Sequence, residues 1–149
     1  MSSQNRFGRT KDDLFLSDDE ALLDMEKVYS WLSLESYWAT GRDVEIIQRS
    51  FHYSYPIGVY QGTRQVGVAR IASDTATFAW LCDVFVDSEF RGRGIGTWLV
   101  EASLEWVRNN GIKRMILVTK DAHDVYARQG FEPLKNPDRW MEFDTRPQT

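Results

Sequence analysis

The sequence contains very little of the two residue types that most often hold metals or form cross-links. Cys82 is the one cysteine, and the two histidines, His52 and His123, lie far apart in the chain. A single cysteine excludes an internal disulfide framework and a paired-cysteine metal motif, and two distant histidines argue against a zinc site. We therefore expect a site that holds no metal.

An excess of positive charge and a long apolar run are also missing. The 18 lysines and arginines are outnumbered by 22 aspartates and glutamates, which gives a formal net charge of −4. This negative net charge does not indicate a basic surface that would bind nucleic acid or an anionic membrane. No apolar run approaches the roughly 20 residues that span a bilayer, and residues 1–11 lack the apolar core of a signal peptide. We expect a cytoplasmic protein with no nucleic-acid or membrane partner.

Aromatic residues, in contrast, are abundant. The chain has 149 residues, of which 42% are hydrophobic and 13% aromatic, including 6 tryptophans. This length and composition fit one globular domain with a sizeable core, and so many rings favour a ring-lined pocket as well. We predict a flexible segment at residues 1–12 and a single domain at 13–145.

Hydrophobic periodicity and turn signals divide this domain into strands and helices. The strands are expected at 14–16, 57–60, 65–71, 77–86, 115–119, 131–133 and 140–143. The helices are expected at 17–32, opened by a capping box of Ser17 and Glu20, and at 43–51, 97–109 and 121–130. Tight turns make the second to fourth strands an antiparallel meander, whereas the helix at 97–109 should make its two flanking strands parallel. The continuous apolar run at 115–119 is typical of a strand covered on both faces.

A glycine-rich loop, Arg91-Gly92-Arg93-Gly94-Ile95-Gly96-Thr97, joins the strand at 77–86 to the next helix. Glycines let a ligand approach the backbone, and a helix start offers unpaired N–H groups and partial positive charge. Such a strand, loop and helix can hold a pyrophosphate. A Walker loop is excluded because Gly96-Thr97-Trp98 does not supply Gly-Lys-Ser/Thr, and the dinucleotide fingerprint fails because Thr97 takes the place of its third glycine.

Two motifs resemble those of the GNAT superfamily of acetyl-CoA-dependent N-acetyltransferases. The loop matches the pattern R/Q-x-x-G-x-G/A from Arg91 to Gly96. Residues 119–131 resemble N-x-x-A-x-x-x-Y-x-x-x-G-F, with Thr119 in place of the asparagine and matches at Ala122, Tyr126, Gly130 and Phe131. The resemblance implies an α/β (α+β) fold with a mixed central sheet, an antiparallel N-terminal meander, a splayed parallel strand pair and about four flanking helices.

The resemblance also implies where acetyl-CoA would bind. The backbone of Val84 and Val86 would pair with the pantetheine arm as though extending the sheet, and the loop would hold the pyrophosphate. The Thr119 hydroxyl could only partly replace the amide of the family's asparagine. The predicted cofactor-binding residues are Val84, Phe85, Val86, Arg91, Gly92, Arg93, Gly94, Ile95, Gly96, Thr97 and Thr119.

The implied reaction is direct acetyl transfer to a primary amine of a small molecule. Tyr126 would be the general acid, because a phenol with a reference pKa near 10 stays protonated at neutral pH and can donate to a departing thiolate. The ring-bearing residues Tyr37, Trp38 and Trp80 are candidate contacts for the acceptor. Cys82 is not expected to carry the acetyl group, because buried strand cysteines are usually inert.

Asp83 is the one charge in the apolar segment 81–86 and has two interpretations. It is either a general base for the incoming ammonium or a structural carboxylate that accepts hydrogen bonds from loop backbone or an arginine. Strand alternation predicts that it points away from the face that carries Trp80 and Cys82.

A function of another class stays open at this stage. The same scaffold could serve as a non-catalytic module that binds or senses acyl-CoA, because a fold does not guarantee a chemistry. The acceptor could be a polyamine, an amino acid, an aromatic amine, an antibiotic or a peptide amine. A homodimer is a common assembly among proteins of the family that the chain resembles.

Overall fold

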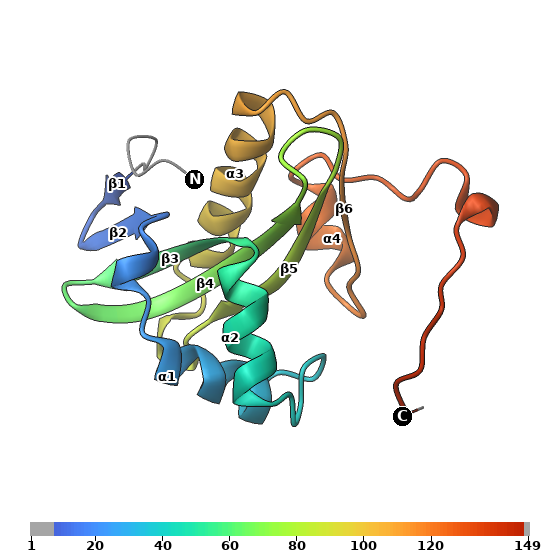
Figure 1. The fold of residues 1–149 in the computed structure, drawn as a ribbon. Helices are drawn as coiled ribbons and strands as arrows, with labels where there is room; N and C mark the ends of the chain where they lie inside the picture. Colours follow the sequence, from blue (N-terminus) through green and yellow to red (C-terminus); the bar gives the residue numbers. More distant parts are fainter. Residues whose placement is uncertain (1–7, 148–149) are drawn as a thin grey trace. The chain divides into compact units, whose positions relative to one another are not determined.

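The computed structural model describes residues 8–147 (Figure 1). The chain divides into two compact units. The first unit ends at Thr119 and the second begins at Lys120. The first unit is built on one six-stranded sheet in the order β1-β2-β3-β4-β5-β6. Its strands are β1 (Gly8–Lys11), β2 (Leu14–Ser17), β3 (Tyr55–Gln61), β4 (Arg64–Ser73), β5 (Ala79–Val86) and β6 (Met115–Leu117).

The sheet is mixed, as predicted. Neighbouring strands from β1 to β5 pair antiparallel, and β5 pairs with β6 in parallel. The crossover between the two parallel strands is α3 (Ile95–Asn109), which is preceded by the short turn η4 (Ser88–Phe90). The predicted GNAT-like architecture is therefore confirmed.

Helices cover both faces of this sheet (Figure 1). On one face α3 packs so closely that a Cβ added to Gly67 would lie 2.9 Å from Ile95. The other face carries η2 (Glu20–Leu22), α1 (Met25–Tyr29), η3 (Ser30–Glu35) and α2 (Val44–His52). The buried side chains that join these helices to the sheet are Val28, Trp31, Leu32, Ala39, Ile47, Phe51, Val68 and Phe85.

The first helix begins later than the predicted capping box. Ser17 is the last residue of β2 and pairs with Gly58, so its backbone is engaged in the sheet and cannot open a helix. Asp24 caps α1 instead, with its side chain accepting a hydrogen bond of 3.2 Å from the Lys27 N–H. The helix then widens into the π-helical segment η3, which buries Trp31 and Leu32.

The N-terminal segment also differs from the prediction of a flexible stretch through residue 12. Gly8–Lys11 forms β1 and pairs with β2 across a tight turn in which Asp12 has a φ of 55°. Residues 1–7 of the predicted flexible segment lie outside the described residues. The ordered sheet therefore begins earlier than composition suggested.

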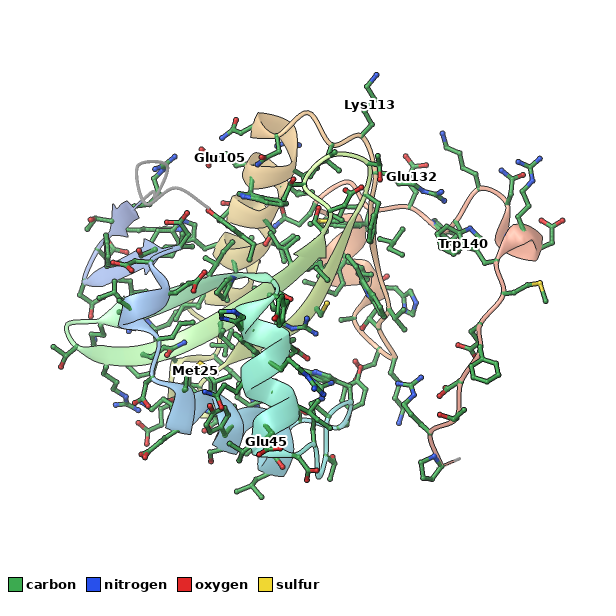
Figure 2. All side chains as sticks on the ribbon, in the orientation of Figure 1. Met25, Glu45, Glu105, Lys113, Glu132 and Trp140 are labelled. Carbon is green, nitrogen blue, oxygen red and sulfur yellow. The ribbon has the colours of Figure 1, made fainter. Side chains whose placement is uncertain are left out.

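The second unit contains less regular structure than predicted. Its helices are α4 (His123–Ala127) and the single turn η5 (Pro137–Arg139). The predicted strands at 131–133 and 140–143 are not strands in the part of the chain that the structure describes, and Figure 2 shows Glu132 and Trp140 on irregular segments. Met141 and Phe143 are each 96% exposed, so no sheet covers them.

Strand β6 is shorter and more open than its apolar sequence predicted. It comprises three residues, all half-buried, and Thr119 lies beyond its end. Its pairing with β5 is limited to Ala79–Leu81, so strand geometry extends no further. Within residues 8–147, no helix is long and apolar enough to cross a membrane.

Candidate functional site

Strand β5 carries a β-bulge at Asp83. Arg70 of β4 pairs with Cys82, and Val68 pairs with Phe85, so two residues of β5 oppose one residue of β4 between these pairs. Asp83 adopts a φ of 53°, the left-handed conformation that such a bulge can require. The extra residue interrupts the alternation. Arg70, which pairs with Cys82, donates to the Asp83 carboxylate, so Asp83 lies on the same face as Cys82. The predicted orientation of Asp83 was therefore wrong.

The Asp83 carboxylate accepts hydrogen bonds from three residues, two in the loop before α2 and one on β4. Its Oδ1 accepts from Trp38 Nε1 at 2.9 Å and from Arg42 Nη1 at 3.3 Å. Its Oδ2 accepts from Arg70 Nε at 2.8 Å and again from Arg42 Nη1 at 3.2 Å. Trp38 and Arg42 belong to the loop before α2, so this carboxylate ties that loop to the sheet.

These contacts favour a structural role for Asp83. A carboxylate accepts about four hydrogen bonds, and all four are in use here. The side chain is 1% exposed, so an incoming ammonium would have to displace a guanidinium to reach it. This arrangement is the one that the structural interpretation of Asp83 predicts. That Asp83 does not act as the general base stays a prediction.

Beyond the bulge, one edge of β5 has no strand partner within the described residues. Pairing with β6 ends at Leu81, whereas β5 continues to Val86. The Asp87 N–H donates to Val66 O on β4 at 2.9 Å, so by alternation the backbone groups of Val84 and Val86 point toward the open edge. Arg91 Nε reaches Val86 O at 3.3 Å. An extended chain with amide groups can add to such an edge.

The glycine loop follows this edge directly. Gly92 and Gly94 have φ angles of 84° and 80°, which explains why both positions are glycine. Gly94 is the N-cap of α3 and has no side chain to cap it, so the first N–H groups of the helix are available to a ligand. The next glycine, Gly96, leaves room, since an added Cβ would lie 3.7 Å from Val86 Cγ2.

The two arginines of the loop have different surroundings. Arg91 lies with its guanidinium carbon 5.5 Å from the centre of the Phe85 ring. Arg93 forms an ion pair of 2.6 Å with Asp13 in the turn between β1 and β2. Arg91 is therefore better placed to neutralise a phosphate next to the strand edge, whereas Arg93 would first have to leave a carboxylate.

The structure brings most of the predicted site residues together in the first unit. The strand edge, the loop and Asp83 are continuous there, and the acceptor candidates Tyr37, Trp38 and Trp80 are 53%, 37% and 44% exposed. Tyr126 belongs to α4 in the second unit. Within that unit its ring meets Phe131 edge-on at 5.8 Å, and its carbonyl accepts from the Phe131 N–H at 3.2 Å.

The first unit also contains a hollow that the sequence did not predict. It has a volume of about 200 Å³ and lies near the C-terminal end of α3, at Trp106, Tyr55 and Ile71. Burial raises the pKa of Tyr55, whose hydroxyl also donates to the Asp18 carboxylate. None of the predicted site residues lines it, and no motif in the sequence marks it. No group of three potential metal ligands occurs within residues 8–147.

Cys82 should react slowly with electrophiles and should not be needed for turnover. Burial raises the pKa of its thiol, although the Arg70 guanidinium opposes the shift, so the thiol stays protonated at neutral pH. We expect iodoacetamide to alkylate Cys82 more slowly than it alkylates glutathione at neutral pH. Cys82→Ala should keep kcat within about threefold, because we expect no acyl-cysteine intermediate. Detection of an acetylated Cys82 by mass spectrometry during turnover would contradict this.

Comparisons with known proteins agree with this geometry. A model of the acetyltransferase (GNAT) family matches residues 25–131. The Gibberella zeae protein named "Putative acetyltransferase FG08082" is 26% identical over 139 residues, covering 80% of this chain and 78% of that protein. A solved GNAT-family structure from Xanthomonas campestris is 39% identical, with a TM-score of 0.85 over 89% of this chain and 93% of that chain. A Staphylococcus aureus structure at 18% identity shares the fold, with a TM-score of 0.71 over 89% of this chain and 99% of that chain. The chain therefore belongs to the GNAT family of acetyltransferases, whose members use acetyl-CoA as the acetyl donor.

Proposed function

We propose that this N-acetyltransferase transfers the acetyl group of acetyl-CoA directly to a primary amine of a small molecule. The observation that carries the proposal is the continuity of two features in the first unit. The open edge of β5 at Val84 and Val86 leads straight into a loop with bare glycines at the start of α3. The strand edge suits a ligand arm that carries amides, and the helix start suits a pyrophosphate joined to that arm.

The donor would be held mainly by backbone. The N–H and C=O groups of Val84 and Val86 would pair with the amides of the pantetheine arm, and the N–H groups at the start of α3 would bind the pyrophosphate. Arg91 adds charge from the loop. Thr119, at the end of the first unit, would contribute a hydroxyl where the family's asparagine offers an amide.

The chemistry requires an amine nucleophile and a protonated leaving group. The neutral amine attacks the thioester carbonyl, the attacking nitrogen releases a proton to solvent, and the tetrahedral intermediate expels the thiolate of coenzyme A. Tyr126 gives its phenolic proton to that thiolate, and a phenol of reference pKa about 10 is protonated at neutral pH when it does so. The ammonium form of the acceptor would lose its proton to water, because the acceptor sites of Asp83 are filled.

The direct test is thiol release from acetyl-CoA in the presence of a panel of primary amines, with mass spectrometry of the acetylated product. We expect thiol release that depends on the amine and matches the product in amount. Calorimetry with acetyl-CoA alone provides the binding control. Tight binding without turnover across a broad panel would instead support a module that only binds or senses acyl-CoA.

Gly96→Val should weaken acetyl-CoA binding while the fold survives. The added side chain has ordinary contact distance to Val86 but projects where the pyrophosphate must approach the helix start. We expect Kd to rise by about tenfold or more, which corresponds to about 1.4 kcal/mol. Arg91→Ala should have a smaller effect, because the backbone N–H groups remain.

Glu101→Val is the matched control for Gly96→Val. Glu101 lies on an exposed part of the same helix, so the substitution tests the effect of a β-branched residue in α3 without touching the loop. It should leave Kd unchanged. If Gly96→Val bound acetyl-CoA as tightly as the wild type, with an unchanged circular dichroism spectrum, the assignment of the loop would be wrong.

A further inference from the structure

The cluster around Asp83 contains an imbalance of charge. Two guanidinium groups, Arg42 and Arg70, share this one carboxylate. Within residues 8–147, neither arginine forms an ion pair with any other carboxylate. The side chains of Arg70 and Arg42 are 14% and 25% exposed, so solvent screens their charge only in part. The cluster therefore carries one positive charge in excess at a partly buried place.

Arg42 is the less fully bonded of the two arginines. Arg70 is held by Asp83 at 2.8 Å and by Ser54 Oγ at 2.8 Å, and its guanidinium lies 5.8 Å from the centre of the Phe51 ring. Arg42 donates to Asp83 through one nitrogen only, Nη1, at the longer distances of 3.2 and 3.3 Å. Its Nε and Nη2 have no partner among the described residues. Two donor nitrogens of the planar Arg42 guanidinium are therefore available to another partner.

Two exposed aromatic rings belong to the same loop as Arg42. These rings, of Trp38 and Tyr37, meet at 5.1 Å. Trp38 donates to the same carboxylate as Arg42, which fixes the loop against β5. Asp83 directly precedes Val84, the first residue of the strand edge that we assign to the acetyl donor. A molecule bound at Arg42 would therefore lie close to the proposed site of transfer.

We propose that the acetyl acceptor is an amine that also carries a carboxylate, and that Arg42 binds this carboxylate. This inference rests on the proposed function and names its substrate class. A guanidinium edge whose Nε and Nη2 are both free matches a carboxylate in shape, and the negative charge of the ligand would balance the excess positive charge of the cluster. Arg42 is then a residue that determines specificity, and the neighbouring rings would contact the apolar part of the acceptor.

The test compares amines that differ only in the carboxylate. L-phenylalanine is paired with 2-phenylethylamine, and L-lysine with cadaverine. We expect the wild type to favour the carboxylate-bearing member of at least one pair by about tenfold or more in kcat/KM, as a charged hydrogen-bonded pair would give. Arg42→Gln should remove this preference by raising KM for the amino acid much more than it raises KM for the plain amine. Arg42→Lys should keep part of the preference.

Two controls keep the outcomes separate. Arg49→Gln removes an exposed arginine from α2 and should leave the preference intact. Binding of N-acetyl-L-phenylalanine and of N-acetyl-2-phenylethylamine, measured by calorimetry on wild type and Arg42→Gln, does not depend on turnover. A preference for the carboxylate that disappears in Arg42→Gln supports the inference even if the proposed reaction fails. Acetylation of plain amines as efficient as that of amino acids, with no effect of Arg42→Gln, would overturn the inference and leave the acetyl transfer standing.

Discussion

Replacing Tyr126 by phenylalanine should lower kcat by about 10²–10⁴ and leave the affinity for acetyl-CoA within about twofold, as expected when one positioned general acid is removed. The thiolate of coenzyme A would then have to take its proton from water. A thiol with a reference pKa of about 8.5 is mainly protonated at neutral pH, so a positioned donor assists departure of the thiolate. The substitution removes one oxygen and no ring, so contacts to the donor should survive.

The fold should tolerate this change. Within the second unit the Tyr126 ring meets Phe131 edge-on, a contact that a phenyl ring keeps, and the local backbone bonds of α4 do not involve the hydroxyl. Tyr53→Phe is the matched control, because Tyr53 is 77% exposed and belongs to no part of the proposed mechanism. Single-turnover measurements isolate the chemical step from product release. Unchanged turnover under those conditions would remove Tyr126 from the mechanism.

The sequence predicted the parts of the fold that depend on local pattern. Alternation and tight turns predicted the meander of β3, β4 and β5, and the helix between two strands predicted the parallel pairing of β5 with β6. The glycine motif likewise predicted a loop whose backbone adopts left-handed angles, as Gly92 and Gly94 do. In these cases the residue type itself carries the physical constraint, so spacing alone is informative.

The parts that failed depend on partners distant in the sequence. Ser17 has the side chain of a helix cap, but its pairing with Gly58 holds it in β2. The Asp83 side chain at the bulge is bound by Trp38 and Arg42, which precede it by 45 and 41 residues. No local sequence pattern indicates these contacts, so strand alternation predicted the wrong face for Asp83. The link between the ring-bearing loop and β5 could be found only in three dimensions.

Asp83→Asn should destabilise the protein strongly without changing the acidic limb of its pH–rate profile. The amide has no charge, so Arg42 and Arg70 would lose their one counter-ion while Arg70 stays largely buried. Breaking a buried ion pair costs about 3 kcal/mol or more, which for a chain of this size lowers Tm by about 6–12 °C. Asp13→Asn is the matched control. It breaks an ion pair of 2.6 Å with Arg93 whose two side chains are 50% and 38% exposed, and we expect little change in Tm.

The pH profile separates stability from catalysis. If Asp83 took the proton of the incoming ammonium, Asp83→Asn would lose both activity and the acidic limb of kcat/KM. With all four acceptor positions of Asp83 filled by Trp38, Arg42 and Arg70, we expect the limb to persist. The measurement must be made well below the lowered Tm, with circular dichroism showing that the variant is folded. An Asp83→Asn variant that kept its Tm but lost the acidic limb would make Asp83 the base, and the water-mediated route would then be wrong.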